Sequence, residues 1–277
     1  MNYDLTRILA IIALCLQTVS CSRILALFPH VGKSHFDVFN PYLKQLAARG
    51  HQLVVVSHFP QNTKVENLTD ISISGSVPIP PTHGIVFERV ENKGSIHNAI
   101  LLRNLAEPHC NGILQLPQVK NLVNQSFDLV ITELFDTDCF LGVVQQIDTP
   151  FIYFSSSILM PWGNDRFGNP DNPSYIPNLF LHFSDKMNFL ERLENTIDTL
   201  VDKYLIFPLL YERPDHALAE KYLQVPLPPL PEIAKRGSLL LVNSHFSLNR
   251  PRPLVPSVIE VGGIHIDKPP KKLPQVT

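Results

Sequence analysis

The sequence lacks the features that mark several common classes of protein. It has no apolar run of 18 residues, the length at which a helix can begin to cross a bilayer. Its formal net charge is -2, and its Lys and Arg residues are spread along the chain, so they form no basic segment that could neutralise phosphates. It has no acidic tail either. A nucleic-acid partner is therefore not expected.

The short motifs of self-contained nucleotide and zinc sites are also missing. There is no C-x-x-C, H-E-x-x-H or G-x-S-x-G, and no G-x-G-x-x-G follows the first predicted strand. The run Gly32-Lys33-Ser34 imitates the end of a phosphate-binding loop, but Leu27 occupies the position of the required first glycine. We therefore predict no resident cofactor and no metal site.

Cysteine is scarce. Of four cysteines, Cys15 and Cys21 lie in or beside the amino-terminal apolar segment, which leaves Cys110 and Cys139 for the folded part of the chain. An oxidising compartment would permit a bridge between these two, and two free buried thiols are the alternative. Sequence alone does not decide between them, because a disulfide requires the two Cα atoms to lie close together.

The amino terminus reads as a secretory signal peptide over residues 1–22. Its apolar run, 8–16, is too short to span a membrane, and small polar residues follow it, so we predict cleavage near residues 20–22. An uncleaved anchor or a buried first helix is the alternative. The sequons at Asn67 and Asn124 fit the same compartment. The mature chain is expected in the lumen of the secretory pathway, secreted, or on a membrane surface.

The pattern of the mature chain predicts an α/β fold with a doubly wound, Rossmann-like parallel sheet. Arg23–Pro29 is a continuous apolar run that suits a strand buried on both faces, and Gln52–Ser57 is the next such run. A helix lies between them and begins either at Pro41 or near Ser34. Such a strand, helix and strand form a right-handed parallel unit. Further strands are predicted at Phe127–Thr132, Phe151–Phe154, Leu239–Val242 and Val258–Val261.

The longest predicted helix covers Asp185–Phe207, with Ser184 as its N-cap. Apolar residues recur along one of its faces at helical spacing: Met187, Leu190, Leu193, Ile197, Leu200, Val201 and Tyr204. We assign residues 23–265 to one domain. The proline-rich loops 77–81 and 225–231 are expected to be ordered, whereas residues 266–277 look like the start of an interdomain linker.

Residues able to carry chemistry follow two of the predicted strands. His35 lies in the loop after the first strand, and the acids Glu133, Asp136 and Asp138 follow the strand Phe127–Thr132. In an open α/β sheet, ligands bind beyond the carboxyl ends of the strands, so both groups can reach one crevice. A histidine backed by a carboxylate acts as a general base. The alternative to a catalytic role is a structural one: His35 would be a surface or capping residue, and Asp138 would be the N-cap of a helix over 139–147.

Six segments of the sequence occur in an order that resembles the acceptor-binding half of animal UDP-glycosyltransferases. One of them, TDCFLG (137–142), is most similar to insect members. The six segments are GKSH (32–35), LAARGHQLVVV (46–56), FDLVITE (127–133), TDCFLG (137–142), SYIP (174–177) and VIEVGGI (258–264). The resemblance implies a two-domain, GT-B-type fold of facing Rossmann-like halves. The amino-terminal half would hold a small lipophilic acceptor and the other half a UDP-sugar co-substrate.

The resemblance also implies roles for the candidate catalytic residues. The family's base histidine falls on His35. Its partner aspartate falls on Glu133, which is one methylene longer, so either Glu133 or Asp138 would support His35. The implied reaction is an inverting displacement at the anomeric carbon that requires no metal. His51 is expected to cap or pack, and the 59–81 loops and the 185–207 helix to border the acceptor pocket.

In relatives, the sequence motifs that bind the nucleotide and a membrane anchor follow the linker. This sequence contains neither. The resemblance therefore leads us to expect an endoplasmic-reticulum detoxification enzyme of which this chain is a truncated form, inactive alone. The sugar is expected to be glucose from the insect likeness and glucuronate from the vertebrate one. The alternative is a non-catalytic module that binds lipophilic ligands or forms oligomers with full-length transferases and regulates them. A secreted binding protein of similar topology is a third reading.

Overall fold

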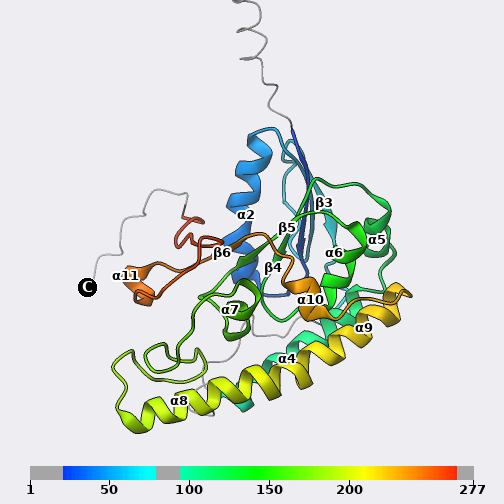
Figure 1. Ribbon diagram of the computed structural model, residues 1–277. Helices are drawn as coiled ribbons and strands as arrows, with labels where there is room; N and C mark the ends of the chain where they lie inside the picture. The colour runs from blue at the N-terminus through cyan, green and yellow to red at the C-terminus, as the bar shows by residue number, and fades with distance from the viewer. Residues whose placement is uncertain (1–20, 79–93, 267–277) are drawn as a thin grey trace, which may run out of the picture.

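The computed structural model describes residues 21–78 and 94–266, which build one parallel sheet flanked by helices (Figure 1). Its seven strands lie in the order β3-β2-β1-β4-β5-β6-β7, and each neighbouring pair is parallel. The strands are β1 (Arg23–Phe28), β2 (Gln52–Ser57), β3 (Leu68–Ser72), β4 (Leu129–Glu133), β5 (Phe151–Ser155), β6 (Leu240–Val242) and β7 (Val258–Glu260). The predicted α/β class and doubly wound parallel sheet are confirmed.

The central strands are buried on both faces, as their apolar runs predict. In β1, Leu25, Ala26 and Leu27 are all 0% exposed. Strand β1 pairs with β2 on one side and with β4 on the other, with Leu27 opposite Thr132. Because the chain winds outward from β1 in one direction and then returns to its other side, the loops after β1 and β4 lie side by side at the carboxyl edge. That junction positions the candidate site.

Helices cover the two faces of the sheet (Figure 1). One face packs against α2 (Lys33–Ala48), whose Phe39, Leu43 and Ala47 are fully buried. The larger core on the other face includes residues of α4 (Gly94–Ile113), α6 (Leu141–Ile147) and α10 (Leu230–Ala234). The remaining helices are α5 (Pro117–Lys120), η1 (Asn121–Asn124), η2 (Asp138–Phe140), α7 (Pro161–Phe167), α8 (Phe189–Val201), η3 (Asp202–Ile206), η4 (Pro208–Glu212), α9 (Arg213–Leu223) and α11 (Phe246–Asn249).

Helix α2 begins at Lys33 and runs through Pro41, which settles the two alternatives for its start. Proline has no N–H to donate to the carbonyl four residues earlier, so Pro41 removes one bond from the helix interior without ending it. The early start matters for function, because it puts His35 in the first turn of the helix, directly beyond the carboxyl end of β1.

The long helix differs from its prediction at its start. Its N-cap is Asn188 and not Ser184. The Asn188 side chain accepts hydrogen bonds from the backbone N–H groups of Leu190 and Glu191 in a capping box. The Ser184 hydroxyl accepts from the Lys186 N–H, before the helix begins. The correct cap follows from Asn188 and Glu191 being three residues apart. After Val201 the chain continues as helix through the π-helical segments η3 and η4 into α9.

Two elements were not predicted from the sequence. Strand β3 lies within the predicted 59–81 loops, and its mixed burial fits an edge strand. Helix α4, with 20 residues, was not assigned. Residues 1–20, 79–93 and 267–277, which hold most of the predicted signal peptide, part of the 77–81 loop and nearly all of the predicted linker, lie outside the described residues. Within the described residues, no helix is long and apolar enough to cross a membrane.

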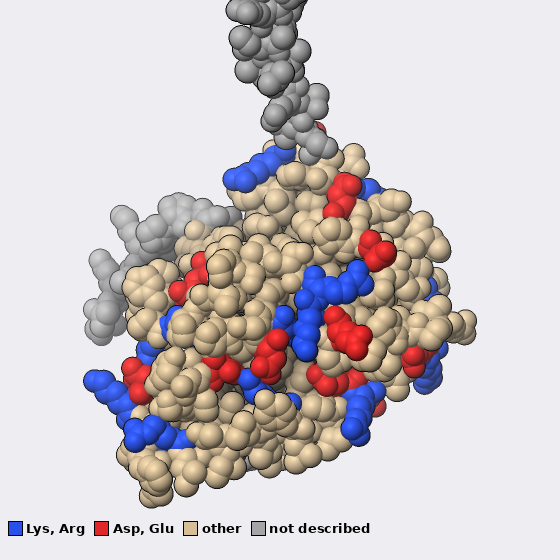
Figure 2. All heavy atoms as spheres, viewed as in Figure 1, with Lys and Arg blue, Asp and Glu red and all other residues tan. Residues whose placement is uncertain are grey.

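Charged side chains of both signs are interspersed on the face shown in Figure 2, where Lys and Arg lie beside Asp and Glu. Two exposed ion pairs, Arg236 with Asp148 and Arg250 with Asp185, also bring opposite charges together at the surface. A face of this kind has no single-signed patch to attract a polyanion.

Candidate active site

His35, in the first turn of α2, contacts Glu133, the last residue of β4. Nδ1 of His35 lies 2.6 Å from Oε1 of Glu133, and the Ser156 hydroxyl donates to the same oxygen at 3.1 Å. The Glu133 side chain is 1% exposed and that of His35 is 21% exposed, so the carboxylate is enclosed and the ring reaches the surface. A carboxylate that accepts from Nδ1–H leaves Nε2 with its lone pair directed away from the acid. The pair therefore has the geometry of an oriented general base.

Asp138 lies elsewhere. Its carboxylate accepts two hydrogen bonds from the Arg166 guanidinium, one of them at 3.1 Å, and both side chains are buried. Its side chain makes no capping hydrogen bond at the start of η2 or α6, so the N-cap interpretation is wrong. The partner was not predictable, because Arg166 lies 28 residues further along the chain. Of the two acids considered as support for His35, the structure brings Glu133 to it and pairs Asp138 with Arg166.

Asp136 forms a second histidine–carboxylate pair next to the first. Nδ1 of His30 lies 3.3 Å from Oδ1 of Asp136, and the rings of His30 and His35 have centroids 4.4 Å apart. Both rings pack against Phe135 in edge-to-face arrangements. Asp136 was among the acids predicted from the sequence, but His30, five residues before His35, was not predicted. The rule that pointed to His35, its position after a buried strand, applies equally to His30.

Burial and charge set the protonation of this group. Burial lowers the pKa of His58 and of His109 to about 4, so both are neutral at pH 7. Burial alone would also lower the pKa of His30, but the Asp136 and Glu133 carboxylates more than offset it and the pKa is raised. The pKa of Asp136, which burial alone would raise, is lowered by its histidine neighbours, His30 most of all. The pair His30–Asp136 is thereby favoured in its charged form.

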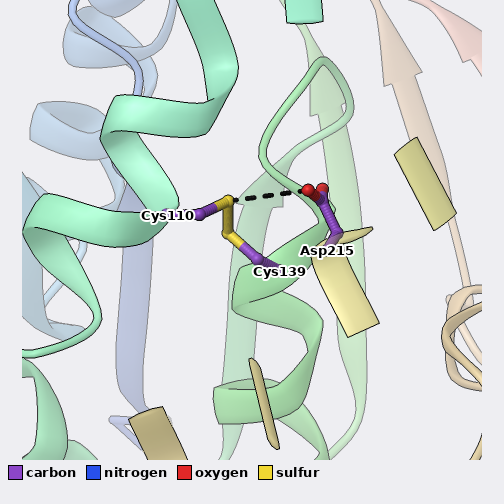
Figure 3. A group of neighbouring side chains, drawn as sticks. All are labelled: Cys110, Cys139 and Asp215. Atoms are coloured by element: carbon purple, nitrogen blue, oxygen red, sulfur yellow. Dashed lines mark hydrogen bonds between the residues drawn. A yellow bond between two sulfur atoms is a disulfide. The ribbon is translucent and has the colours of Figure 1, made fainter. Parts of the chain in front are cut away.

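A disulfide ties this region to the neighbouring helix. Cys110 in α4 is bonded to Cys139 in η2, which answers the question that the sequence left open (Figure 3). Asp215 of α9 lies against the bridge, with Oδ1 3.9 Å from Sγ of Cys110, and forms a buried ion pair with Arg103. The three groups are close enough to bind a metal ion, but two sulfur atoms joined in a disulfide are not free to do so.

A separate cavity of about 130 Å³ opens between α7, η3, η4 and α10. It is lined by Trp162 and Phe207, whose rings are stacked 4.8 Å apart, and by charged side chains of both signs. Neither His35 nor Glu133 lines it. His51, the other histidine considered, accepts a hydrogen bond from the Ser22 N–H at the opposite edge of the sheet, so the interpretation that it packs rather than reacts fits its position.

Comparison with known proteins decides the family. The family model described as "UDP-glucoronosyl and UDP-glucosyl transferase" matches residues 82–277. The chain belongs to this family. UDP-glucosyltransferase 2 of Dactylopius coccus is 38% identical over 96% of the chain and 52% of its own length. UDP-glucuronosyltransferase 1-2 of Rattus norvegicus is 30% identical over 87% of the chain and 48% of its own length. The chain thus spans about half the length of the curated UDP-glycosyltransferases it matches.

Solved glycosyltransferase structures are more distant. Phytolacca americana UGT2, solved with UDP-2fluoro-glucose and pterostilbene, is 14% identical over 87% of the chain and 54% of its own length, with a TM-score of 0.40. The glycosyltransferase of kitacinnamycin is 13% identical over 81% of this chain and 46% of its own, with a TM-score of 0.41. At that level of likeness, the ligands bound to those proteins say nothing about this chain.

Proposed function

We propose that this chain is the acceptor-binding half of an inverting UDP-glycosyltransferase and that His35 is its general base. The observation that carries the proposal is the 2.6 Å contact between Nδ1 of His35 and the enclosed Glu133 carboxylate, at the sheet edge where α/β proteins bind ligands. Membership of the UDP-glycosyltransferase family supports the reaction class.

The proposed reaction follows from that geometry. Nε2 of His35 takes the proton of an acceptor hydroxyl while the hydroxyl oxygen forms a bond to the anomeric carbon of the sugar. The bond from that carbon to UDP breaks at the same time, its electron pair leaves with UDP, and the configuration at the carbon inverts. Glu133 holds the ring in the productive tautomer and stabilises the imidazolium that forms. The step requires no metal, because the leaving diphosphate is held by the other half of a full-length transferase.

The compartment and the partners belong to the same proposal. The Cys110–Cys139 bridge supports an oxidising lumen such as that of the endoplasmic reticulum, and the two sequon residues Asn67 and Asn124 are exposed, as glycan acceptors must be. The acceptor is a small lipophilic compound, and the donor is UDP-glucose or UDP-glucuronate. Without donor contacts, we expect the 277-residue chain to bind acceptors but not to transfer sugar.

A chimera tests the proposal directly. The chain would be joined to the donor-binding half of the 38% identical relative and assayed with UDP-glucose, UDP-glucuronate and a panel of phenols. We expect transfer by the chimera alone, with kcat about 10²–10⁴-fold lower after His35→Ala. Glu133→Gln should lower kcat by a smaller factor, and Glu133→Asp should retain more activity than the glutamine variant.

His51→Gln is the matched control, because His51 lies at the opposite edge of the sheet and its loss should leave transfer unchanged. A folded chimera that is inert with every acceptor, or active without His35, would refute the assignment. The reading as a binding or regulatory module would then replace it, and acceptor binding by the 277-residue chain would measure that function.

A further inference from the structure

Two histidine–carboxylate pairs stand side by side at the candidate active site, and the proposed function uses only one of them. In both pairs the histidine follows β1. The acid is either the last residue of β4, as Glu133 is, or lies three residues beyond it, as Asp136 does. In both pairs Nδ1 is the ring atom nearest the acid. The opposite, Cδ2–Nε2 edge of each ring is therefore the edge left for a ligand.

Gly32 shows that these two edges converge. A Cβ added to Gly32 would lie 2.7 Å from Cδ2 and 2.8 Å from Nε2 of His30, and 3.0 Å from Cδ2 of His35. A side chain at this position would clash with the His30 ring and crowd the His35 ring, so glycine lets the chain pass close to both ring edges. The two rings have centroids 4.4 Å apart, and the side chains of His30 and His35 are 9% and 21% exposed, so both rings keep some surface open beside each other.

His30 differs from His35 in its charge environment. Asp136 is 1% exposed, and neither of its oxygens has a hydrogen-bond partner among the described residues, so its charge is compensated mainly by the adjacent His30 ring. The other groups that face His30 are His35 from α2, Glu133 at the end of β4, His58 after β2 and His109 from α4. His58 and His109 are neutral at pH 7, whereas the adjacent Asp136 carboxylate raises the pKa of His30, and a protonated His30 ring would donate from Nε2.

We propose that His30 is a specificity-determining residue whose Nε2–H donates a hydrogen bond to a second oxygen atom beside the reactive hydroxyl of the acceptor. The inference rests on the proposed function and deepens it by naming a class of acceptor. That class is phenols with an oxygen on the neighbouring carbon, such as catechols, ortho-methoxyphenols and ortho-hydroxy carbonyl compounds. One oxygen meets His35 and loses its proton there, while the other meets His30 and only accepts a hydrogen bond. A para isomer cannot contact both rings at once.

The test uses pairs of isomers with the same composition. Binding of 2-methoxyphenol and 4-methoxyphenol to the 277-residue chain would be measured by calorimetry at several pH values, and kcat and KM for the same pair would be measured with the chimera. We expect the ortho isomer to bind about tenfold tighter, as a hydrogen bond from a charged donor provides. His30→Phe, which keeps a ring but has no donor, should reduce the ratio to about one.

Two further variants separate recognition from mere packing. His30→Gln retains a side-chain donor and should keep part of the ortho preference. Asp136→Asn removes the charge that favours protonated His30, so it should reduce the ortho preference. In the unaltered chain, the preference should fall as pH rises, because protonated His30 donates from Nε2 only below its raised pKa. If His30→Phe does not fold, these two variants and the pH series decide the question.

The outcomes distinguish this inference from the proposed function. An isomer ratio near one in the unaltered chain, or a ratio unchanged in folded His30 variants, would overturn the role of His30, whatever His35→Ala does to turnover. Conversely, if the chimera transfers sugar without His35, the proposed base is wrong, and the binding ratio still tests His30 by itself. A preference that depends on His30 and declines with rising pH, alongside turnover that requires His35, supports both.

Discussion

The central strands and the long helix that starts at α8 bury opposite kinds of side chain. In β1 the apolar Leu25, Ala26 and Leu27 are all 0% exposed, and the paired acids and histidines lie at the carboxyl edge of the strands. Along α8, by contrast, polar Asn195 and Thr199 are buried, whereas apolar side chains are exposed, among them Leu190 at 70% and Ile197 at 53%. The regular apolar stripe of this helix therefore faces away from the core.

Hydrogen bonds explain this reversal. The Asn195 side chain accepts from the Asn178 N–H and donates to the carbonyls of Pro173 and Ile176, so the polar face of α8 holds the loop beside it. The lesson is that periodicity identifies the faces of a helix but not which one is buried. In a strand buried on both faces, no such choice exists.

The largest expected effect lies at the strand edge. Asp138→Ala would leave the buried Arg166 guanidinium without its carboxylate, and we expect a loss of about 3–5 kcal/mol in the free energy of unfolding. Asp185→Ala is the matched control, because its partner Arg250 is exposed and such pairs contribute at most about 1 kcal/mol. Urea unfolding followed by circular dichroism measures both. Equal losses would mean that burial of the Asp138 pair has no energetic consequence.

A leucine truncated in each region compares them directly. Leu27→Ala in β1 creates a cavity at a position that is 0% exposed, and should cost about 2–5 kcal/mol. Leu193→Ala in α8 removes a side chain that is 47% exposed, and should change stability by less than about 0.5 kcal/mol. A large loss for the Leu193 variant in the same unfolding assay would show that another surface covers the apolar stripe in solution.

Asn195→Ala tests the reversed burial of α8. The change leaves the Asn178 N–H and two carbonyls without their partner, and we expect a loss of about 1–3 kcal/mol. The polar residue should thus matter more than the leucine two positions before it, contrary to the usual order for an amphipathic helix. If thermal unfolding ranked Leu193→Ala as the more harmful change, the burial assigned to this helix would be wrong.

The smallest expected effects are in the pH dependence of stability, where the two regions have opposite signs. The pKa of His109 is about 4, below the unfolded value of 6.5, so its contribution is lost as pH falls through that window. The pKa of Asp202 at the end of α8 is about 6, above the unfolded 3.8, so its contribution is lost as pH rises through 6. Relative to the unaltered chain, His109→Gln should gain stability as pH is lowered from about 6.5 to 4.

Over nearly the same window, Asp202→Asn should gain relative stability as pH is raised from about 4 to 6. Unfolding midpoints at closely spaced pH values would separate the two trends. Parallel trends for the two variants would contradict the assigned protonation states.

The features predicted correctly from the sequence are those that the local pattern of residues determines. The strands β1 and β2, the helix between them and the placing of His35 and the acids at one edge of the sheet follow from apolar runs and parallel topology, whereas Glu133 as the partner of His35 came from the family resemblance. What the sequence could not predict depends on distance in space, such as Arg166 as the partner of Asp138 and the pairing of Cys110 with Cys139. Strand β3 (Leu68–Ser72) was not predicted, because it is an edge strand of the sheet and has no apolar run. The catalytic roles of His35 and Glu133 stay predictions.

The pairing of β1 with β4 also has a consequence for biosynthesis. His35 and Glu133 are 98 residues apart in the sequence, so at a synthesis rate of roughly 5–20 residues per second the histidine leaves the ribosome roughly 5–20 s before its carboxylate exists. By then β1, α2 and β2 have been made, but β1 still lacks its pairing with β4, and His35 still lacks the Glu133 carboxylate. A nascent chain halted before β4 would therefore display a formed helix and an unpaired His35, and the site would assemble only when translation delivers the fourth strand.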